Sequence, residues 1–237
     1  MNPYQKLLNR KRKWTPVQTT AGTCKEGAEE AIFRALALRH MELPVGDFIN
    51  DALATDVPTN ARDVLLSNVK DEENHDLALG YIANAYGVDE QAEAEALRLK
   101  SAWEAHPDHT ITKALVAERA IFFVLLPFFR FNGDSSMRTV SADISRDEQI
   151  HVATNSLVHT ELGYNISPSL DKLRKATINW VMQPLGTHSD KYLDKNFWID
   201  SSDRLMYEGK APQLAETKAA RMPAFFEHSN VNLPKYA

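Results

Sequence analysis

Two segments of the sequence carry a glutamate and a histidine at a spacing that suits metal binding. In the first segment, Glu72 stands three residues before His75. In the second, Glu148 stands three residues before His151. On a helix, residues three apart lie on one face, so each pair can direct a carboxylate oxygen and an imidazole nitrogen at the same point. The two pairs predict metal chemistry wherever the fold brings them together.

A further glutamate stands 30 residues before each of these glutamates: Glu42 before the first and Glu118 before the second. The midpoint of each interval falls in a turn-forming segment, Thr55–Asn60 in one case and Asn132–Ser136 in the other. In an antiparallel helix pair, residues equidistant from the turn lie at the same height, here about 22 Å along each helix. Each predicted hairpin therefore raises one Glu and one Glu-x-x-His to a common level.

The combined pattern is that of a dinuclear metal site inside a four-helix bundle, where two helices supply a Glu and two supply Glu-x-x-His. Four carboxylates and two neutral imidazoles carry a charge of −4, which matches two divalent cations, and such ligands suit Fe and Mn. Glu29 or Glu30 could replace Glu42, but each lies about three turns too far from the matching level. The predicted metal ligands are Glu42, Glu72, His75, Glu118, Glu148 and His151.

The elements that must position these ligands are long helices. A first helix is expected to begin at Thr23, which can cap it, and to run to about Ala54 with an interruption at Pro44. A second is expected to end at Tyr86, before Gly87. No strand pattern of any length is present, so the predicted fold class is all-α. The remaining helices are expected over residues 89–105, 110–131, 137–162, 169–183 and 190–207.

The composition limits the class of protein. The chain has 237 residues, 43% of them hydrophobic, which is enough for a substantial core. A net charge of −5 argues against a nucleic-acid partner. A single cysteine, Cys24, excludes an internal disulfide framework and suits a reducing cytosol. No signal peptide is recognisable and the longest apolar run, Ala120–Phe129, is too short to span a bilayer, so we expect a cytoplasmic protein without a membrane partner.

The chain is expected to form one helical domain over residues 1–215. Residues 1–22 are expected to be an irregular N-terminal arm. Residues 216–237 are polar around an apolar cluster at Met222–Phe226, and we expect them to form a mobile C-terminal tail.

The residues around the second pair resemble the small, radical-generating subunit of class I ribonucleotide reductase. Ile144–His151 reads Ile-Ser-Arg-Asp-Glu-Gln-Ile-His and is similar to that family's Ile-Ser-Arg-Asp-Glu-x-x-His helix. Similar segments are Glu118–Phe123, Asp203–Leu205 and Phe225–Glu227. The likeness begins near residue 40 and continues to the end, and it implies a ferritin-like four-helix core with additional helices.

The resemblance also implies roles beyond the ligands. Asp147 would accept a hydrogen bond from His75, and Trp14 would be the tryptophan of the radical path, although a packing role for it is equally open. Tyr236 matches the redox-active tyrosine of the tail, or is a plain terminal residue. The family's subunit is a homodimer that reacts with O2 or a reduced oxygen species and docks on a large catalytic subunit through its C-terminal tail.

One departure from the family changes the expected chemistry. The radical tyrosine of the family lies four residues after the first ligand histidine, and here that position is Leu79. Leucine cannot be oxidised, and Tyr81 and Tyr86 point elsewhere on the helix. The resemblance then implies that the oxidising equivalent stays on the metal pair, which favours Mn/Fe or Mn/Mn over Fe/Fe.

Smaller departures concern the first ligand and the tail. The family usually has Asp at the position of Glu42, and its tail continues past the tyrosine that Tyr236 matches. Two other functions use the same ligands: a dinuclear Fe or Mn/Fe oxygenase acting on a small molecule, and a ferritin-like iron store. An oxygenase needs a substrate cavity beside the metals, and a storage cage has no use for the residues past 163.

Overall fold

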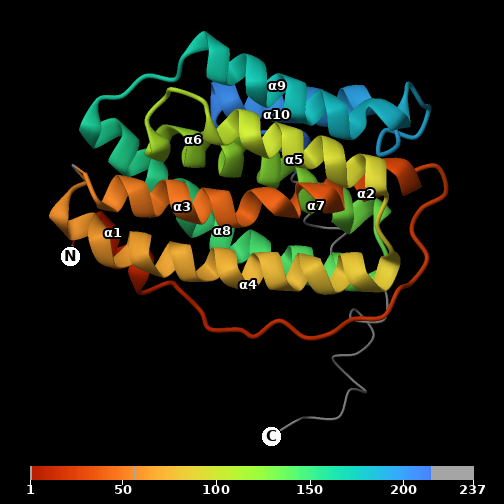
Figure 1. Ribbon diagram of the computed structural model, residues 1–237, viewed down its shortest axis with the longest axis horizontal. Helices are drawn as coiled ribbons and strands as arrows, with labels where there is room; N and C mark the ends of the chain where they lie inside the picture. Colours follow the sequence, from red (N-terminus) through yellow and green to blue (C-terminus); the bar gives the residue numbers. More distant parts are fainter. Residues whose placement is uncertain (1, 56, 215–237) are drawn as a thin grey trace, which may run out of the picture.

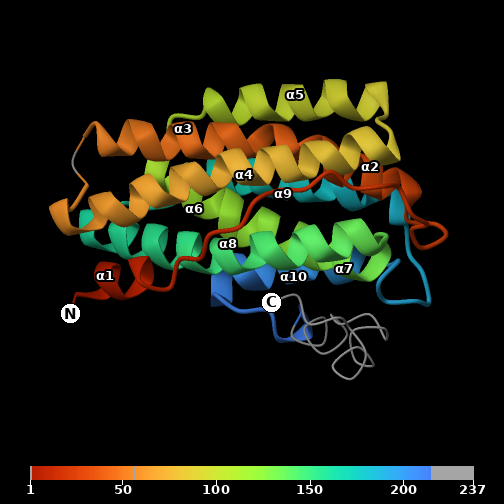
Figure 2. The same cartoon turned by 90° about the horizontal axis from the view of Figure 1, so that it is seen from below.

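A computed structural model describes residues 2–55 and 57–214 of the chain. All regular secondary structure in these residues is helical, and they contain no strand. The long helices lie side by side in Figures 1 and 2. The all-α prediction is confirmed. The expected tail, residues 216–237, lies outside the described residues, and so does Tyr236.

Four helical segments surround the centre of the molecule. The first hairpin consists of α3 (Glu42–Leu53) and α4 (Arg62–Tyr86). The second consists of α6 (Thr110–Ala117) with its continuation α7 (Phe123–Asn132), and of α8 (Ser135–Leu162). Helix α3 packs against α4 and α6, and α8 packs against α4, α6 and α7, so the four segments close a ring. This is the four-helix core that the spacing of the glutamates predicted.

The additional helices cover the core. Helices α2 (Glu29–Ala37), α5 (Glu90–Glu104) and α9 (Pro168–Met182) pack against one another, and α10 (Lys195–Glu208) packs against α9 and α7. Figure 1 shows α9 and α10 together along one side of the molecule and α4 along the other. None of the described helices is both long and apolar enough to cross a bilayer.

The turns of the two hairpins fall where they were expected. Between α3 and α4, a short 3₁₀ turn at Thr59–Ala61 leads into α4. Between α7 and α8, Asp134 caps α8 by accepting a hydrogen bond from the Met137 amide at 2.8 Å. The chain leaves α8 at Gly163, whose φ of 68° is the left-handed conformation that glycine adopts most readily.

The N-terminal region differs from the prediction in two ways. Residues 1–22 are not entirely irregular, because Pro3–Leu8 form α1. The Asn2 side chain caps this helix, Pro3 occupies its first position, and Tyr4 and Leu7 are buried beneath it. The next helix, α2, begins at Glu29 rather than at Thr23, since the intervening Gly27 has a φ of 86° that a helix cannot contain.

Two of the expected helices are interrupted, the first as predicted and the second without a prediction. The chain forms a 3₁₀ segment at Leu38–Met41 between α2 and α3, and Pro44 lies in the first turn of α3, where its missing amide hydrogen is not needed. The interruption predicted at Pro44 therefore occurs a few residues before it. Between α6 and α7, the five residues Glu118–Phe122 form a π-helix that no sequence pattern indicated.

Candidate metal centre

The six predicted ligands come together in the middle of the four-helix core. Glu42 is the first residue of α3, and Glu118 is the first residue of the π-helix. The two Glu-x-x-His pairs lie in the middle of α4 and α8. All six residues are at most 2% exposed, and their side chains lie close together away from solvent: Glu42, Glu72, His75, Glu118, Glu148 and His151.

The Nδ1 atom of His75 points into this cluster. It lies 3.3 Å from Glu72 Oε2 and 3.3 Å from Glu148 Oε1. It lies 3.7 Å from Glu42 Oε2. We call this set the His75 half of the cluster.

The Nδ1 atom of His151 points into the same cluster from the other side. It lies 2.9 Å from Glu72 Oε1, 3.5 Å from Glu148 Oε1 and 3.7 Å from Glu118 Oε1. We call this set the His151 half. Because Glu72 and Glu148 approach both histidines, they are the shared carboxylates of the cluster, while Glu42 and Glu118 each belong to one half.

The cluster has the donor set of a dinuclear site. Each of the four motif residues can offer one atom so that the four atoms lie within 4.8 Å of one another. Every predicted ligand also has a buried side-chain atom without a hydrogen bond of acceptable geometry: Glu42 Oε2, both carboxylate oxygens of Glu72 and of Glu148, Glu118 Oε1, and Nδ1 of His75 and of His151. Buried polar atoms are normally paired, so this concentration of unpaired lone pairs fits cations as the missing partners. The residues therefore form a buried carboxylate–histidine cluster that could hold two metal ions.

The electrostatics of the cluster without metal agree with this fit. Burial raises the pKa of Glu42 well above its ordinary value, and the charges of Glu72 and Glu148 add to the effect. Burial and the charge of Glu148 likewise raise the pKa of Glu118. The raised pKa values favour the protonated forms of Glu42 and Glu118 in the absence of metal, as expected for carboxylates that cannot all ionise in one apolar site.

The histidines show the opposite balance. Burial alone would lower the pKa of His75, but its hydrogen bond to Asp147 and the close carboxylates of Glu148, Glu42 and Glu72 raise it well above the ordinary value. Burial also opposes protonation of His151, and the carboxylates of the cluster overcome it. Because a metal ligand must be a neutral imidazole, metal binding has to displace these protons.

Behind the His75 half, Asp147 links the cluster to the N-terminal arm. Asp147 Oδ2 lies 3.5 Å from Nε2 of His75 and accepts a hydrogen bond of 2.6 Å from Nε1 of Trp14. The Trp14 and His75 rings are stacked with their centroids 6.2 Å apart. The structure thus joins the three residues that the family resemblance associated with a radical path, whereas the fourth, Tyr236, is outside the described residues.

Behind the His151 half, the structure shows a matching pair that sequence reasoning missed. Asp71 Oδ2 lies 3.1 Å from Nε2 of His151, and Lys11 Nζ forms an ion pair with the same oxygen. A signal for Asp71 was present, because an aspartate directly precedes the glutamate in both Glu-x-x-His segments. No signal distinguished Lys11 from the other basic residues of the arm.

Two further features hold Glu118 in place. Asn155, four residues after His151, donates a hydrogen bond of 2.6 Å from Nδ2 to Glu118 Oε2. The π-helix that carries Glu118 is held from outside by α10, since the Ser202 hydroxyl donates to the Ala120 carbonyl at 2.6 Å. A π-helix widens the backbone by one residue per turn and is frequent at functional sites.

A polar layer lies next to the His151 half. Asp71 on α4 meets His151 on α8, and His75 meets Asp147, so the two helices are antiparallel in a register that places Asn68 opposite Thr154. Both side chains are fully buried. Both amide atoms of Asn68 and the hydroxyl of Thr154 lack a hydrogen-bond partner. The cluster therefore continues into a polar region on this side.

On α4, the turn that follows His75 carries an apolar residue. Leu79, four residues after His75, lines a cavity with Glu42, Phe122 and Leu126. The volume of this cavity is about 10 Å³, roughly the space of one water molecule. No oxidisable side chain stands at the position of Leu79, and Tyr86 on the same helix instead contacts the Cys24 sulfur with its hydroxyl.

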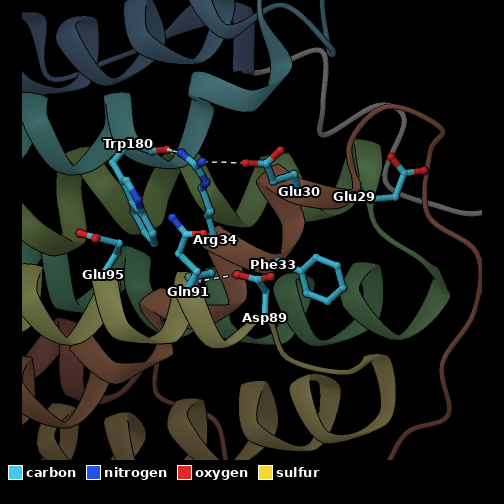
Figure 3. A pocket seen from close by; sticks show the side chains of 9 residues that line it. Glu29, Glu30, Phe33, Arg34, Asp89, Gln91, Glu95 and Trp180 are labelled. Atoms are coloured by element: carbon cyan, nitrogen blue, oxygen red, sulfur yellow. Dashed lines mark hydrogen bonds and ion pairs between the residues drawn. The ribbon is translucent and has the colours of Figure 1, made fainter.

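The larger hollows of the molecule lie at its surface. One of about 460 Å³ lies between α2, α5 and α9, and Figure 3 shows its Arg34 directed toward Glu30 and the backbone of Trp180. Both contacts of Arg34 are hydrogen bonds of 2.7 Å. None of the six predicted ligands lines this hollow. A second hollow of about 460 Å³ has Trp14 in its wall, together with the arm and the first half of α8.

Comparisons with protein-family models, with curated proteins and with solved structures found no match for this chain. The function of the chain has to be inferred from the buried cluster and from the residues that surround it.

Proposed function

We propose that this chain is the radical-generating small subunit of a class I ribonucleotide reductase. The observation that carries the proposal is the continuous hydrogen-bonded connection from the cluster through Asp147 to Trp14. A metal site that only stores ions has no use for an oxidisable indole attached to one ligand. The Ile144–His151 segment, which resembles the helix of that family, supplies both the ligands and Asp147.

Two bound Mn or Fe ions would supply an oxidant strong enough to start radical chemistry in another subunit. The protein holds their ligands in an enclosed, water-poor site. Asp147 fixes the His75 ring so that Nδ1 faces the cluster, in the manner of carboxylates behind metal-bound histidines. Asp147 Oδ2 is also placed to hold the Nε1 proton of Trp14 when the indole is oxidised, because the two atoms are 2.6 Å apart.

The metal pair, rather than a tyrosine, is the proposed store of the oxidising equivalent. The position next to Glu42 that the family uses for its radical tyrosine is Leu79, and the cavity there is too small for an added ring. The proposal therefore favours Mn/Fe or Mn/Mn over Fe/Fe. Activation would use O2 or a reduced oxygen species, both small enough to reach an enclosed site.

The rest of the proposal concerns partners. The chain would act in the cytoplasm as a homodimer of about 53 kDa, twice its mass of 26.7 kDa. Its C-terminal segment, residues 216–237, would dock on the large catalytic subunit, with Tyr236 continuing the path from Trp14. A size measurement separates this dimer from the large shell of an iron store.

An oxygenase acting on a small molecule is the alternative, since it would use the same ligands and would not need a tyrosine at Leu79. Such an enzyme needs room for a substrate beside the metals. The cavity that reaches Glu42 has only about 10 Å³, which counts against this alternative.

The direct test is nucleotide reduction by the Mn- and Fe-loaded chain together with its cognate large subunit. We expect reduction with the native chain and a loss of at least about 100-fold with Trp14→Phe, the scale expected when a reacting group is lost. Metal content should be unchanged in that variant. Trp180→Phe is the matched control, because Trp180 lies on α9 away from the cluster. Full reduction by Trp14→Phe would exclude the proposed path, and no reduction by the native pair would exclude the proposed function.

A further inference from the structure

The two histidines are backed in the same way by residues of opposite character. Each Nε2 faces an aspartate that belongs to the other histidine's helix, Asp147 for His75 and Asp71 for His151. The N-terminal arm then supplies one residue to each aspartate. It supplies Trp14 to Asp147 and Lys11 to Asp71.

We propose that Lys11 is a positioning residue for the His151 half of the metal centre: through Asp71 it fixes the ring of His151 and so secures one of the two ions. This role rests on the proposed metal centre, although not on nucleotide reduction. It also distinguishes the halves, because Lys11 can hold its aspartate but, unlike Trp14, cannot be oxidised.

Burial makes the Lys11 contact specific. The Lys11 side chain is 9% exposed, that of Asp71 is 11% exposed and that of His151 is fully buried. A lysine placed in such surroundings loses most of its hydration and is retained only where a carboxylate compensates for it. A lysine without such a partner would be more stable in solvent, so the buried position of Lys11 indicates that its contact with Asp71 is specific.

The contact also determines which nitrogen of His151 faces the ions. Lys11 has donors and no acceptor, so it can only donate to the Asp71 carboxylate, whose Oδ2 also lies 3.1 Å from Nε2 of His151. The neighbouring Nε2 of His151 must then be the donor, which leaves the Nδ1 lone pair directed at Glu72, Glu118 and Glu148. Fixing the tautomer and ring orientation in this manner is what outer residues do for metal-bound histidines.

The arm provides its own control residue. Arg12 follows Lys11, and its Nη2 pairs with Asp143 on α8 at 3.2 Å. Both partners of that ion pair are about one-third exposed, and neither touches a predicted ligand. Figure 2 shows the arm running between α4 and α8, where all these contacts are made. Losing Arg12 therefore weakens arm docking and removes one positive charge without disturbing His151.

The test compares Mn²⁺ binding by the full chain with that of Lys11→Met and Arg12→Met, using the EPR signal of free Mn²⁺. We expect the native chain and Arg12→Met to bind two ions alike. In Lys11→Met, one dissociation constant should rise by about 10- to 100-fold, the usual effect of removing an outer partner of a metal ligand. The other constant should stay unchanged. Unfolding temperatures of the three proteins establish that each is folded.

A second readout follows the ring itself. With Zn²⁺ as a diamagnetic probe, ¹⁵N-histidine spectra should show the Nε2–H form for both cluster histidines in the native chain. In Lys11→Met, the His151 ring alone should show a mixture of protonation forms, and Lys11→Arg should restore the single Nε2–H form. Equal Mn²⁺ binding by Lys11→Met and Arg12→Met would overturn the role of Lys11, as would tighter binding by Lys11→Met. A native chain that binds no ions would overturn the metal centre itself, whereas failure of nucleotide reduction alone would leave this inference intact.

Discussion

The His75 half and the His151 half of the cluster have the same types of ligand in different surroundings. Four residues after His75 stands the apolar Leu79, whereas four residues after His151 stands Asn155, which donates to Glu118. The outer aspartates differ as well, since the one behind His75 meets an indole and the one behind His151 meets an ammonium. The ligand pattern is thus nearly two-fold symmetric, while its environment is not.

This difference separates two tasks. The proposed metal binding would depend on the symmetric part, in which Glu72 and Glu148 approach both histidines. On the proposed function, the direction of electron transfer would come from the asymmetric part, because among the described residues the oxidisable Trp14 is connected to the His75 half and not to the His151 half. The spacing of Glu and His in the sequence indicates the symmetric ligands but contains no information about the residues behind them.

The largest expected effect is loss of a shared carboxylate. Glu72→Ala removes an oxygen donor from both halves, so the binding of both ions should be lost. The loss in affinity should exceed about 100-fold, the largest effect usual for residues that only contact a metal ligand. Glu42→Ala removes a donor from the His75 half only, so one ion should remain. Metal analysis after dialysis measures the ratio of ions to protein.

Glu73→Ala is the control for that comparison, because Glu73 is the exposed neighbour of Glu72 on α4. It should bind metal like the native chain. If Glu72→Ala and Glu42→Ala lose the same number of ions, Glu72 is not shared and the division into two halves is wrong.

The sequence predicted the symmetric part of the site well, for a geometrical reason. Equal spacing of glutamates about two turns converts directly into equal height on a pair of helices, and the structure places Glu42 and Glu118 accordingly. The contacts of the arm were less accessible. Residues such as Lys11 lie in a segment of irregular backbone, where no helical or strand periodicity indicates which side chains face the core.

The backbone irregularities were also beyond the sequence pattern. The π-helix at Glu118–Phe122 has the composition of an ordinary buried helix, and it depends on α10, which is remote in sequence. The left-handed Gly27 and the cap at Asn2 are local signals that could have corrected the starts of α2 and α1. Local rules thus account for helix ends, whereas tertiary contacts account for the distortion inside a helix.

The next effect is a pH dependence that metal should reverse. In the metal-free protein the pKa values of His75 and His151 are raised above the ordinary 6.5, and those of Glu42 and Glu118 above 4.5. Above pH 4.5 for the two glutamates, and above pH 6.5 for the two histidines, the folded chain keeps protons that the unfolded chain releases, so the free energy of unfolding falls as pH rises. Each retained proton lowers it by about 1.4 kcal/mol per pH unit.

Calorimetry in the presence of a chelator should therefore show a melting temperature that decreases from pH 5.5 to pH 7.5, by about 2–4 °C for each kcal/mol lost. The pKa of Glu72 is lowered despite burial, because His151 and His75 stabilise its charge; its contribution is complete above pH 4.5 and does not change in this range. With Mn²⁺ in excess the trend should invert, since ions replace the protons. A metal-free melting temperature that rises with pH would contradict the protonated cluster.

The smallest effect tests whether the polar layer of the His151 half is dry. Thr154 is fully buried with an unpaired hydroxyl opposite Asn68, and valine has the same shape without that hydroxyl. Removing an unsatisfied buried group should stabilise the protein, by about 1 kcal/mol. Chemical denaturation of the metal-free protein measures the change, with Thr160→Val as the control, because the exposed Thr160 bonds the Ser156 carbonyl at 2.8 Å. Destabilisation by Thr154→Val would mean that the hydroxyl has a hydrogen-bond partner such as a buried water molecule. The His151 half would then differ from the apolar surroundings of Leu79 in its hydration as well as in its side chains.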